Sequence, residues 1–325
     1  MILAGDVGGT KTRLALYEPG ASVREPVLER RLPSREHATL EALVQEFLAV
    51  APARPGRAVL GIAGPVVGQR VEATNLPWRI DAEELSAAIG GAPVLLVNDL
   101  EATGWGLPLL DAGEVETLHP GAPQPGNRAL IAAGTGLGEA LLVREGRSWR
   151  PCPSEGGHTD FGPRDALEDE LLRWLRERYG RVSYERILSG PGLADLYRFL
   201  AATGRGTASP DVAARFATAE DPGAVVSEAA LYGSCGRARL ALERFVSIYG
   251  AEAGNLALKA LAVDGVYLGG GIAPRILPFL RAGGFFEAFR DKGRLTPVLA
   301  RIPVTLLRDD RAALWGAARL ALAQA

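Results

Sequence analysis

Three glycine-rich turns in the sequence have a composition suited to binding phosphate groups. They are Gly8-Gly9-Thr10-Lys11, Gly134-Thr135-Gly136 and Gly269-Gly270-Gly271, and each follows a short apolar run. Backbone N–H groups of such turns can point into one concavity, and glycine permits both the backbone angles and the close approach of a phosphate chain. One such turn alone is more typical of a tight hairpin. Two such hairpins, followed by a strand-Gly-Gly-Gly-helix junction at residues 269–271, predict a clamp for a nucleotide triphosphate.

The two common nucleotide-binding motifs are both excluded. Lys11 follows Thr10 where a Walker A loop requires glycine before its lysine, and the residues after it are typical of a strand instead of a helix. The glycine spacing in GTGLG, residues 134–138, is wrong for a dinucleotide fingerprint, and Ala140 to Val143 again indicates a strand.

The glycine-rich turns lie within an alternation of predicted strands and helices, which is typical of an α/β protein. Residues 129–146 repeat the strand, turn and strand of the N-terminus, which suggests an internal duplication. Residues 117–128 are rich in turn formers, so we predict a loop there and a domain boundary near residue 110. Strands are expected near residues 2–6, 12–17, 58–63, 93–97 and 265–268, and helices near 38–50, 81–89, 165–179, 191–202, 225–233, 236–262 and 311–323.

Composition excludes several classes of partner. The chain has 325 residues, enough for two domains, and a formal net charge of −2, so no basic field is available for nucleic acid or an anionic membrane. No uncharged apolar run reaches the ~18 residues of a membrane span, and the N-terminus lacks the pattern of a secretion signal. Cys152 and Cys235 are too few for a disulfide framework or a four-thiolate zinc site. We therefore expect a cytoplasmic protein.

Short motifs along the whole chain resemble those of one enzyme family. They are GDVGGT at residues 5–10, GIAGPV at 61–66, TNLPW at 74–78, VNDLEA at 97–102, GTGLG at 134–138, SEGGHTDFGP at 154–163, SGPGL at 189–193 and GGGIAP at 269–274. In sequence and order they are similar to the bacterial glucokinase family of the actin, hexokinase and heat-shock chaperone ATPase superfamily. The resemblance implies ATP-dependent phosphorylation of D-glucose at the 6-hydroxyl.

The resemblance also implies a two-lobed α/β fold of the actin/hexokinase-like, or ribonuclease H-like, kind, with glucose bound in a cleft between the lobes. We expect a smaller α/β domain formed by residues 1–110 and 308–325, and a larger, helix-rich α/β domain formed by residues 111–307. Homodimers are common in the family, so a homodimer is expected from the resemblance alone.

Asp99 is the candidate base for the incoming hydroxyl. It follows the apolar run 93–97, and a carboxylate at the carboxyl end of a strand lies where open α/β sheets bind ligands. Asn98-Asp99 is equally consistent with a turn or a helix cap before residues 100–104. The resemblance implies that Asp99 is the catalytic base and that Asn98 and Asp99 bind the sugar.

Glu155 and His158 lie in a predicted loop and supply groups that can bond two neighbouring hydroxyls of a hexose. The resemblance assigns both of them to glucose binding, together with Glu185. From the residues alone, Glu185 is more typical of a first-turn acid that complements a helix dipole behind Ser183.

The resemblance implies that Mg²⁺ is held mainly by ATP phosphates and water, with Asp6 as an outer-sphere partner and no direct protein ligand. Asp6 could instead bond the backbone of its own turn. The residues expected to bind the nucleotide are Asp6, Gly8, Gly9, Thr10, Lys11, Gly134, Thr135, Gly136, Gly270 and Gly271. Lys11 and Thr12 depart from the closest family pattern, which leaves ADP or polyphosphate open as the phosphate donor.

Two other functions remain open at this point. One is a kinase for another hexose, such as mannose, fructose or an N-acetylated hexosamine, because one hydroxyl's orientation depends on fine placement of the binding groups. The other is a sugar-sensing regulator that has lost the chemistry. The presence of Asp99, and the short distance in sequence from Met1 to the first predicted strand, argue against a regulator with a preceding helix-turn-helix.

Overall fold

The structure is a computed structural model that describes residues 1–73 and 76–323. Most of the TNLPW motif is included, but Thr74 and Asn75 lie outside the described residues. Strands and helices alternate through the chain, so the α/β organisation predicted from the sequence is confirmed. Contacts divide the chain into two compact units, which are residues 1–114, 145–153 and 309–325 in the first and residues 115–144 and 154–308 in the second. The two domains expected from the sequence, residues 1–110 with 308–325 and residues 111–307, stay a prediction.

A five-stranded sheet with the order β3-β2-β1-β4-β7 forms the first unit. β1 pairs antiparallel with β2, whereas β1, β4 and β7 run parallel, so the carboxyl ends of these three strands meet at one edge. The elements of this unit are β1 (Ile2–Val7), β2 (Lys11–Tyr17), β3 (Leu28–Pro33), α1 (Leu40–Ala49), β4 (Arg57–Ile62), β5 (Arg70–Glu72), β6 (Arg79–Asp81), α2 (Ala82–Ala88), β7 (Val94–Asn98), α3 (Asp99–Gly106) and α12 (Ala312–Ala323).

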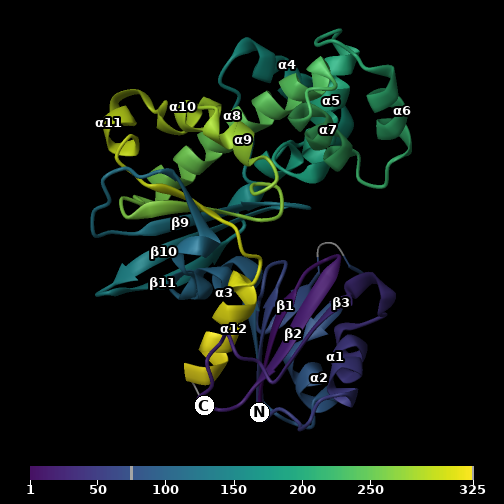
Figure 1. Ribbon diagram of the computed structural model, residues 1–325, viewed down its shortest axis with the longest axis vertical. Coiled ribbons are helices and arrows are strands. Elements are labelled where there is room, and N and C mark those ends of the chain that lie inside the picture. The colour runs from purple at the N-terminus through teal and green to yellow at the C-terminus, as the bar shows by residue number, and fades with distance from the viewer. Residues whose placement is uncertain (74–75, 324–325) are drawn as a thin grey trace. The chain divides into compact units, whose positions relative to one another are not determined.

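Each face of this sheet is covered by a different pair of helices (Figure 1). Leu3 and Leu60 pack on the face that α1 and α2 cover. Ile2 and Val59, their neighbours along the strands, pack on the opposite face with α3 and α12. This alternation of apolar side chains follows from the two-residue period of a strand, and burial on both faces explains why these strands are nearly continuous apolar runs.

α3 and α12 pack with their backbones in close contact. A Cβ atom added at Gly316 would overlap the carbonyl oxygen of Ala102, and one added at Gly106 would overlap that of Ala312. Both positions therefore require glycine because of space. The contact fixes α3, whose first residue is Asp99.

We expect Gly316→Ala to lower the free energy of unfolding by about 2–3 kcal/mol, because the added methyl group forces the two helices apart. Gly113→Ala is the matched control, since an added Cβ there meets no atom within 4 Å. Its effect is expected to stay within about 0.5 kcal/mol. Thermal and denaturant unfolding measure both variants, and equal stabilities would contradict the close packing of α3 on α12.

The second unit contains most of a six-stranded sheet with the order β11-β10-β9-β12-β13-β8. The elements are β8 (Val115–His119), β9 (Arg128–Ala133), β10 (Leu137–Glu145), β11 (Ser148–Ser154), α4 (Ala166–Tyr179), α5 (Gly190–Ala202), α6 (Pro210–Thr218), α7 (Pro222–Leu231), α8 (Gly236–Ala260), β12 (Gly265–Gly269), α9 (Leu277–Arg281), α10 (Gly284–Arg290), α11 (Thr296–Leu299) and β13 (Val304–Leu307). β9 pairs antiparallel with β10 and parallel with β12, as β1 does with β2 and β4. The internal repeat suggested by the sequence therefore extends to strand order and direction.

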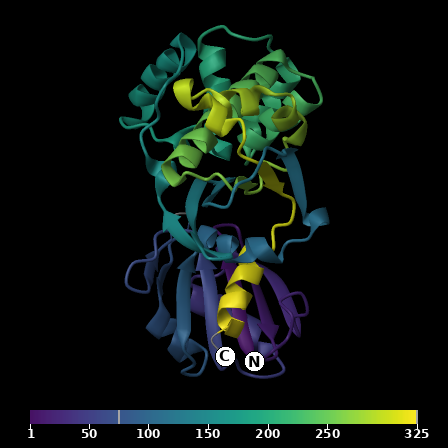
Figure 2. The ribbon, with the colours of Figure 1, turned by 90° about the vertical axis from the view of Figure 1, so that its left-hand side faces the viewer.

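The helices of the second unit gather on one side of its sheet, as Figure 2 shows. The longest of them, α8, has 25 residues and contributes buried side chains along its whole length. An added Cβ at Gly250 or Gly254 would overlap a carbonyl oxygen of α10, so these two helices also pack with their backbones close together. The core of this unit lies around α8.

The structure corrects two local predictions. Residues 117–119, expected in a loop, belong to β8, an edge strand that pairs antiparallel with β13. The turn formers begin only at Pro120, and β8 is half-buried, so its apolar signal in the sequence is weak. The third glycine turn is also not followed directly by a helix, because turns occupy residues 270–276 before α9 begins at Leu277.

Within the two described ranges, no helix combines the length and the apolar character that crossing a bilayer requires.

Candidate active site

The first glycine turn is held rigidly at the end of β1. Within the turn, the backbone N–H of Gly8 donates to the carbonyl of Lys11 at 3.1 Å. Ser34 makes two further hydrogen bonds to the turn. Its hydroxyl donates to the carbonyl of Gly8 at 2.7 Å, and its backbone N–H donates to the carbonyl of Thr10 at 3.0 Å. The hydroxyl oxygens of Ser34 and Thr12 lie 2.9 Å apart. A rigid turn of this kind suits a backbone cradle for an anion.

Asp6 precedes this turn on β1 and pairs in register with Arg13 on β2. Burial raises the pKa of Asp6 to about 6, against the opposing effect of Arg13. A divalent cation nearby would favour the ionised carboxylate. The environment of Asp6 therefore fits the expected outer-sphere partner of Mg²⁺, a role that stays a prediction.

Asn98 and Asp99 occupy the junction of β7 and α3. Asn98 is the N-cap of α3, since its Oδ1 accepts from the N–H of Leu100 at 2.9 Å and from that of Glu101 at 3.3 Å. Its Nδ2 donates to the carbonyl of Gly64 at 3.1 Å. The interpretation as a helix cap is therefore confirmed for Asn98, and its role as a sugar ligand stays a prediction.

Asp99 is the first residue of α3 and is half-buried. Its Oδ1 accepts from the N–H of Leu100 at 2.8 Å. The partial positive charge of a helix N-terminus favours a carboxylate at this position. The helix start fixes the side chain close to the strand end, as a positioned base requires.

The strand ends bring the first turn and Asp99 to the same edge of the sheet. Val7 pairs with Ile62, and Ile62 pairs with Asn98. An added Cβ at Gly61 would lie 2.9 Å from the Cβ of Ala102 and 3.7 Å from the Cα of Asp99, so this glycine lets α3 approach β4 closely.

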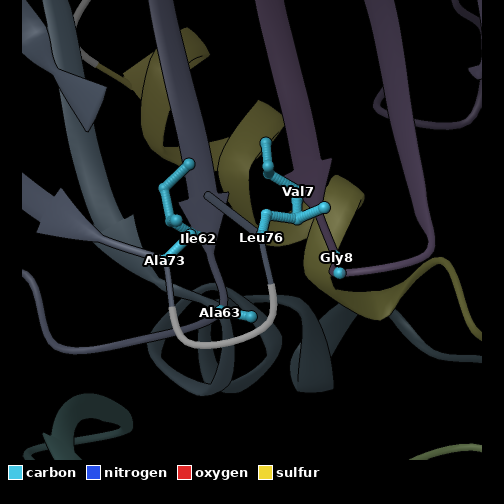
Figure 3. A pocket seen from close by; sticks show the side chains of 7 residues that line it. Val7, Gly8, Ile62, Ala63, Ala73 and Leu76 are labelled. Atoms are coloured by element: carbon cyan, nitrogen blue, oxygen red, sulfur yellow. The ribbon is translucent and has the colours of Figure 1, made fainter. Parts of the chain in front are cut away.

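Figure 3 shows this edge, with Val7 and Gly8 at the end of β1 and Ile62 and Ala63 at the end of β4. A cavity of about 10 Å³ lies between them. This volume is close to the space of one water molecule, so the cavity is too small for a sugar or a nucleotide. Its lining consists of Val7, Gly8, Gly9, Ile62, Ala63, Ala73 and Leu76.

In the second unit, the three predicted sugar ligands lie together. His158 lies between two carboxylates, with Nδ1 3.8 Å from Oε1 of Glu185 and Nε2 3.9 Å from Oε2 of Glu155. Their side chains are 28–48% exposed, which leaves polar atoms accessible to a ligand. Burial raises the pKa of Glu155, and this effect is opposed by His158 and reinforced by Glu185.

Glu185 is fixed by the second glycine turn. Its Oε2 accepts from the backbone N–H of Leu137 at 3.0 Å, and a Cβ added at Gly136 would lie only 2.5 Å from that oxygen. Glu185 does lie in the first turn of a 3₁₀ helix, η5 (Tyr184–Arg186), behind Ser183. Its carboxylate nevertheless bonds a residue 48 positions away, and no local pattern in the sequence signals this contact.

The second and third glycine turns also lie side by side. Gly269 pairs with Ala132, so β9 and β12 end together. The N–H of Ile272 donates to the carbonyl of Ala133 at 3.2 Å, and Gly270 has a φ of +81° that other residues rarely adopt. At the other side of the turn, the first residue of α5 donates its N–H to the carbonyl of Gly134 at 2.9 Å. Gly134, Thr135, Gly136, Gly270 and Gly271 thus form one backbone surface beside a helix N-terminus.

Sequence reasoning missed two polar residues that lie against these segments, Ser34 at the first glycine turn and Glu139 at Gly156. Ser34 left no signal beyond its residue type. Glu139 had one, because it is a charged residue directly after GTGLG and next to the apolar run 140–143. Among the described residues, no group of three His, Cys, Asp or Glu side chains is placed to bind a metal ion.

Comparison with known proteins identifies the family. The glucokinase family model matches residues 3–324, nearly the whole chain. The chain belongs to the glucokinase family. A glucokinase of Nostoc sp. is 42% identical over 98% of each chain. Glucose phosphorylation, the activity expected from the sequence, is thereby confirmed.

Solved structures of glucokinases match the same fold. The glucokinase from Balamuthia mandrillaris in complex with glucose aligns with a TM-score of 0.82 and 25% identity, over 98% of this chain and 93% of that one. A ROK family glucokinase from Streptomyces griseus in complex with glucose and AMPPNP aligns with a TM-score of 0.67 and 23% identity, over 100% of this chain and 99% of that one. The expected two-lobed α/β fold is confirmed.

Proposed function

We propose that the protein transfers the γ-phosphoryl group of ATP to the 6-hydroxyl of D-glucose, with Asp99 as general base. The observation that carries this proposal is the position of Asp99, at the sheet edge that also holds the rigid turn 8–10. Phosphoryl transfer needs an oriented hydroxyl, a base for its proton and oriented N–H groups on the phosphates.

In this reaction Asp99 accepts the proton of the 6-hydroxyl while that oxygen bonds to phosphorus and the bond to the ADP leaving group breaks. Glu155, His158 and Glu185 orient the sugar by accepting and donating hydrogen bonds to neighbouring hydroxyls. Asn98 binds the sugar through the second N–H of its Nδ2, because the first donates to the carbonyl of Gly64. Exclusion of water from the assembled site limits hydrolysis of ATP.

The phosphates are bound by the backbone of the three glycine turns, with Lys11 as an added positive charge. Asp6 would hold the hydrated Mg²⁺ of Mg·ATP in its outer sphere. The ion would neutralise charge on the β- and γ-phosphates when bound. The AMPPNP complex of the Streptomyces griseus relative supports ATP as the donor here. A homodimer remains the expected assembly.

A coupled assay tests donor and acceptor together. Glucose, mannose, fructose and N-acetylglucosamine are each combined with ATP, ADP and polyphosphate, with and without Mg²⁺. We expect the highest kcat/KM for glucose with ATP, and loss of turnover when EDTA removes Mg²⁺. If kcat/KM is higher with polyphosphate than with ATP, polyphosphate is the donor. If it is higher with another sugar than with glucose, that sugar is the acceptor.

A further inference from the structure

A buried acid lies directly beneath the segment that carries Glu155 and His158. Glu139, on β10, is only 1% exposed. A Cβ added at Gly156 would overlap Oε2 of Glu139, so the backbone of η4 (Gly156–His158) rests on this carboxyl group. Among the described residues, neither oxygen of Glu139 makes a hydrogen bond of good geometry, and the carboxyl group of Glu252 lies close enough to raise its pKa. A buried group left in this state costs stability, which indicates a role other than holding the core together.

Glu139 adjoins a polar layer that reaches the second sugar-binding segment. Glu252 on α8 is fully buried and accepts from Nδ2 of Asn255 at 2.8 Å and from Nζ of Lys259 at 3.2 Å. The same Nδ2 of Asn255 donates to the hydroxyl of Tyr184 at 3.1 Å. Tyr184 precedes Glu185 in η5. One layer thus lies under both segments that carry the proposed sugar ligands.

The charge of Glu139 depends on its neighbours. Burial, and then Glu252, raise the pKa of Glu139 to about 8, against the opposing effect of Lys259. Two carboxyl groups in a dry site cannot readily ionise together, so one of them retains a proton at neutral pH. The other titratable or charged groups around this layer are Tyr184 on η5, Tyr249 on α8, Glu155 and His158 on the segment above, Lys292 after α10 and Arg164 before α4.

We propose that Glu139 is a positioning residue for sugar binding: its neutral carboxyl group supports Gly156 and so holds Glu155 and His158 in place, whereas its ionised form weakens sugar binding. This inference rests on the proposed function and adds a residue that touches neither substrate. The ionised form places a second negative charge next to Glu252 and below Glu155, and the backbone above it moves to admit water. Ionisation therefore acts on the sugar ligands and leaves the glycine turn of the first unit unchanged.

The test is the pH dependence of KM for glucose, KM for ATP and kcat in the wild-type protein. Only the neutral form binds sugar well, so Glu139 contributes no change in KM for glucose below about pH 7, and KM rises as the pH passes about 8. With a pKa of about 8, the neutral fraction predicts a rise of about tenfold at about pH 9. KM for ATP does not follow this rise.

Two variants make the assignment specific. Glu139→Gln keeps a neutral side chain of the same shape at every pH, so KM for glucose stays near its neutral value and the rise disappears. Lys259→Met removes the cation that opposes the shift of Glu139, so the rise moves to higher pH. Cys152→Ser is the control, because this free cysteine lies on β11, outside the polar layer; this variant keeps the wild-type rise.

A flat wild-type profile, or a Glu139→Gln variant that folds and keeps the rise, overturns the inference while glucose phosphorylation stands. Absence of glucose phosphorylation at every pH overturns the proposed function itself. Thermal unfolding reports whether Glu139→Gln is folded. If it is not, the Lys259→Met profile decides: a rise at higher pH supports the inference, and an unchanged or lower one overturns it.

Discussion

Asp99→Asn is expected to lower kcat by roughly 10²–10⁴-fold, because the amide cannot accept the proton of the attacking hydroxyl. The substitution keeps the size of the side chain and an oxygen that can still accept from the N–H of Leu100, so the start of α3 is preserved. Glucose should still bind. Steady-state kinetics with isothermal titration of glucose separates the two effects.

Glu101→Gln is the matched control for this substitution. Glu101 is a half-buried acid in the same helical turn, and burial raises its pKa. If kcat fell in Asp99→Asn only because a negative charge was removed from the first turn of α3, kcat of Glu101→Gln would fall by a comparable factor. Turnover of Asp99→Asn close to the wild type would remove Asp99 as the base.

Glu155→Gln should weaken glucose binding by about 10–100-fold, the size expected for a lost charge-assisted hydrogen bond. Binding of an ATP analogue should change little. Glu155 is half-exposed and its Oε2 lies 3.9 Å from Nε2 of His158, whose side chain is also half-exposed, so the substitution leaves no buried charge unpaired. Calorimetric titration with glucose and with the analogue measures both affinities.

Asp160→Asn provides the comparison for this second substitution. Asp160 lies in the same motif, is 77% exposed and pairs with Arg181 at 2.7 Å, an interaction of little energetic value at the surface. Glucose affinity should be unchanged in it. Equal losses of glucose and nucleotide binding in Glu155→Gln would point to misfolding instead of a lost sugar contact.

The sequence predicted the parts of the fold that depend on local pattern. Apolar runs bounded by turn formers can be recognised in a sequence. Runs of this kind predicted the strands β1, β2, β4, β7, β9, β10 and β12. β8 was missed because an edge strand is only partly buried, so polar and apolar residues mix along it. Residues 270–276 were missed because three glycines do not specify where the next helix begins.

The candidate site was predictable where its residues follow a strand end. Asp99 was found in this way, although the sequence could not distinguish a base from a cap at Asn98, and the structure shows the cap. Glu185 could be assigned only through the resemblance, because its partner Leu137 is distant in sequence. Glu139 and Ser34 act through packing against turns, and that depends on tertiary contacts.

The return of α12 to the first sheet affects the order in which the protein can fold during its synthesis. α12 covers the sheet face that holds Ile2 and Val59, yet the ribosome makes this helix after the whole of residues 154–308. In the nascent chain only α3 can cover that apolar face while the second unit emerges and can fold. The part of the face that α12 covers therefore stays exposed until translation nears its end, whereas a circular permutation that places α12 ahead of β1 would let it be covered early.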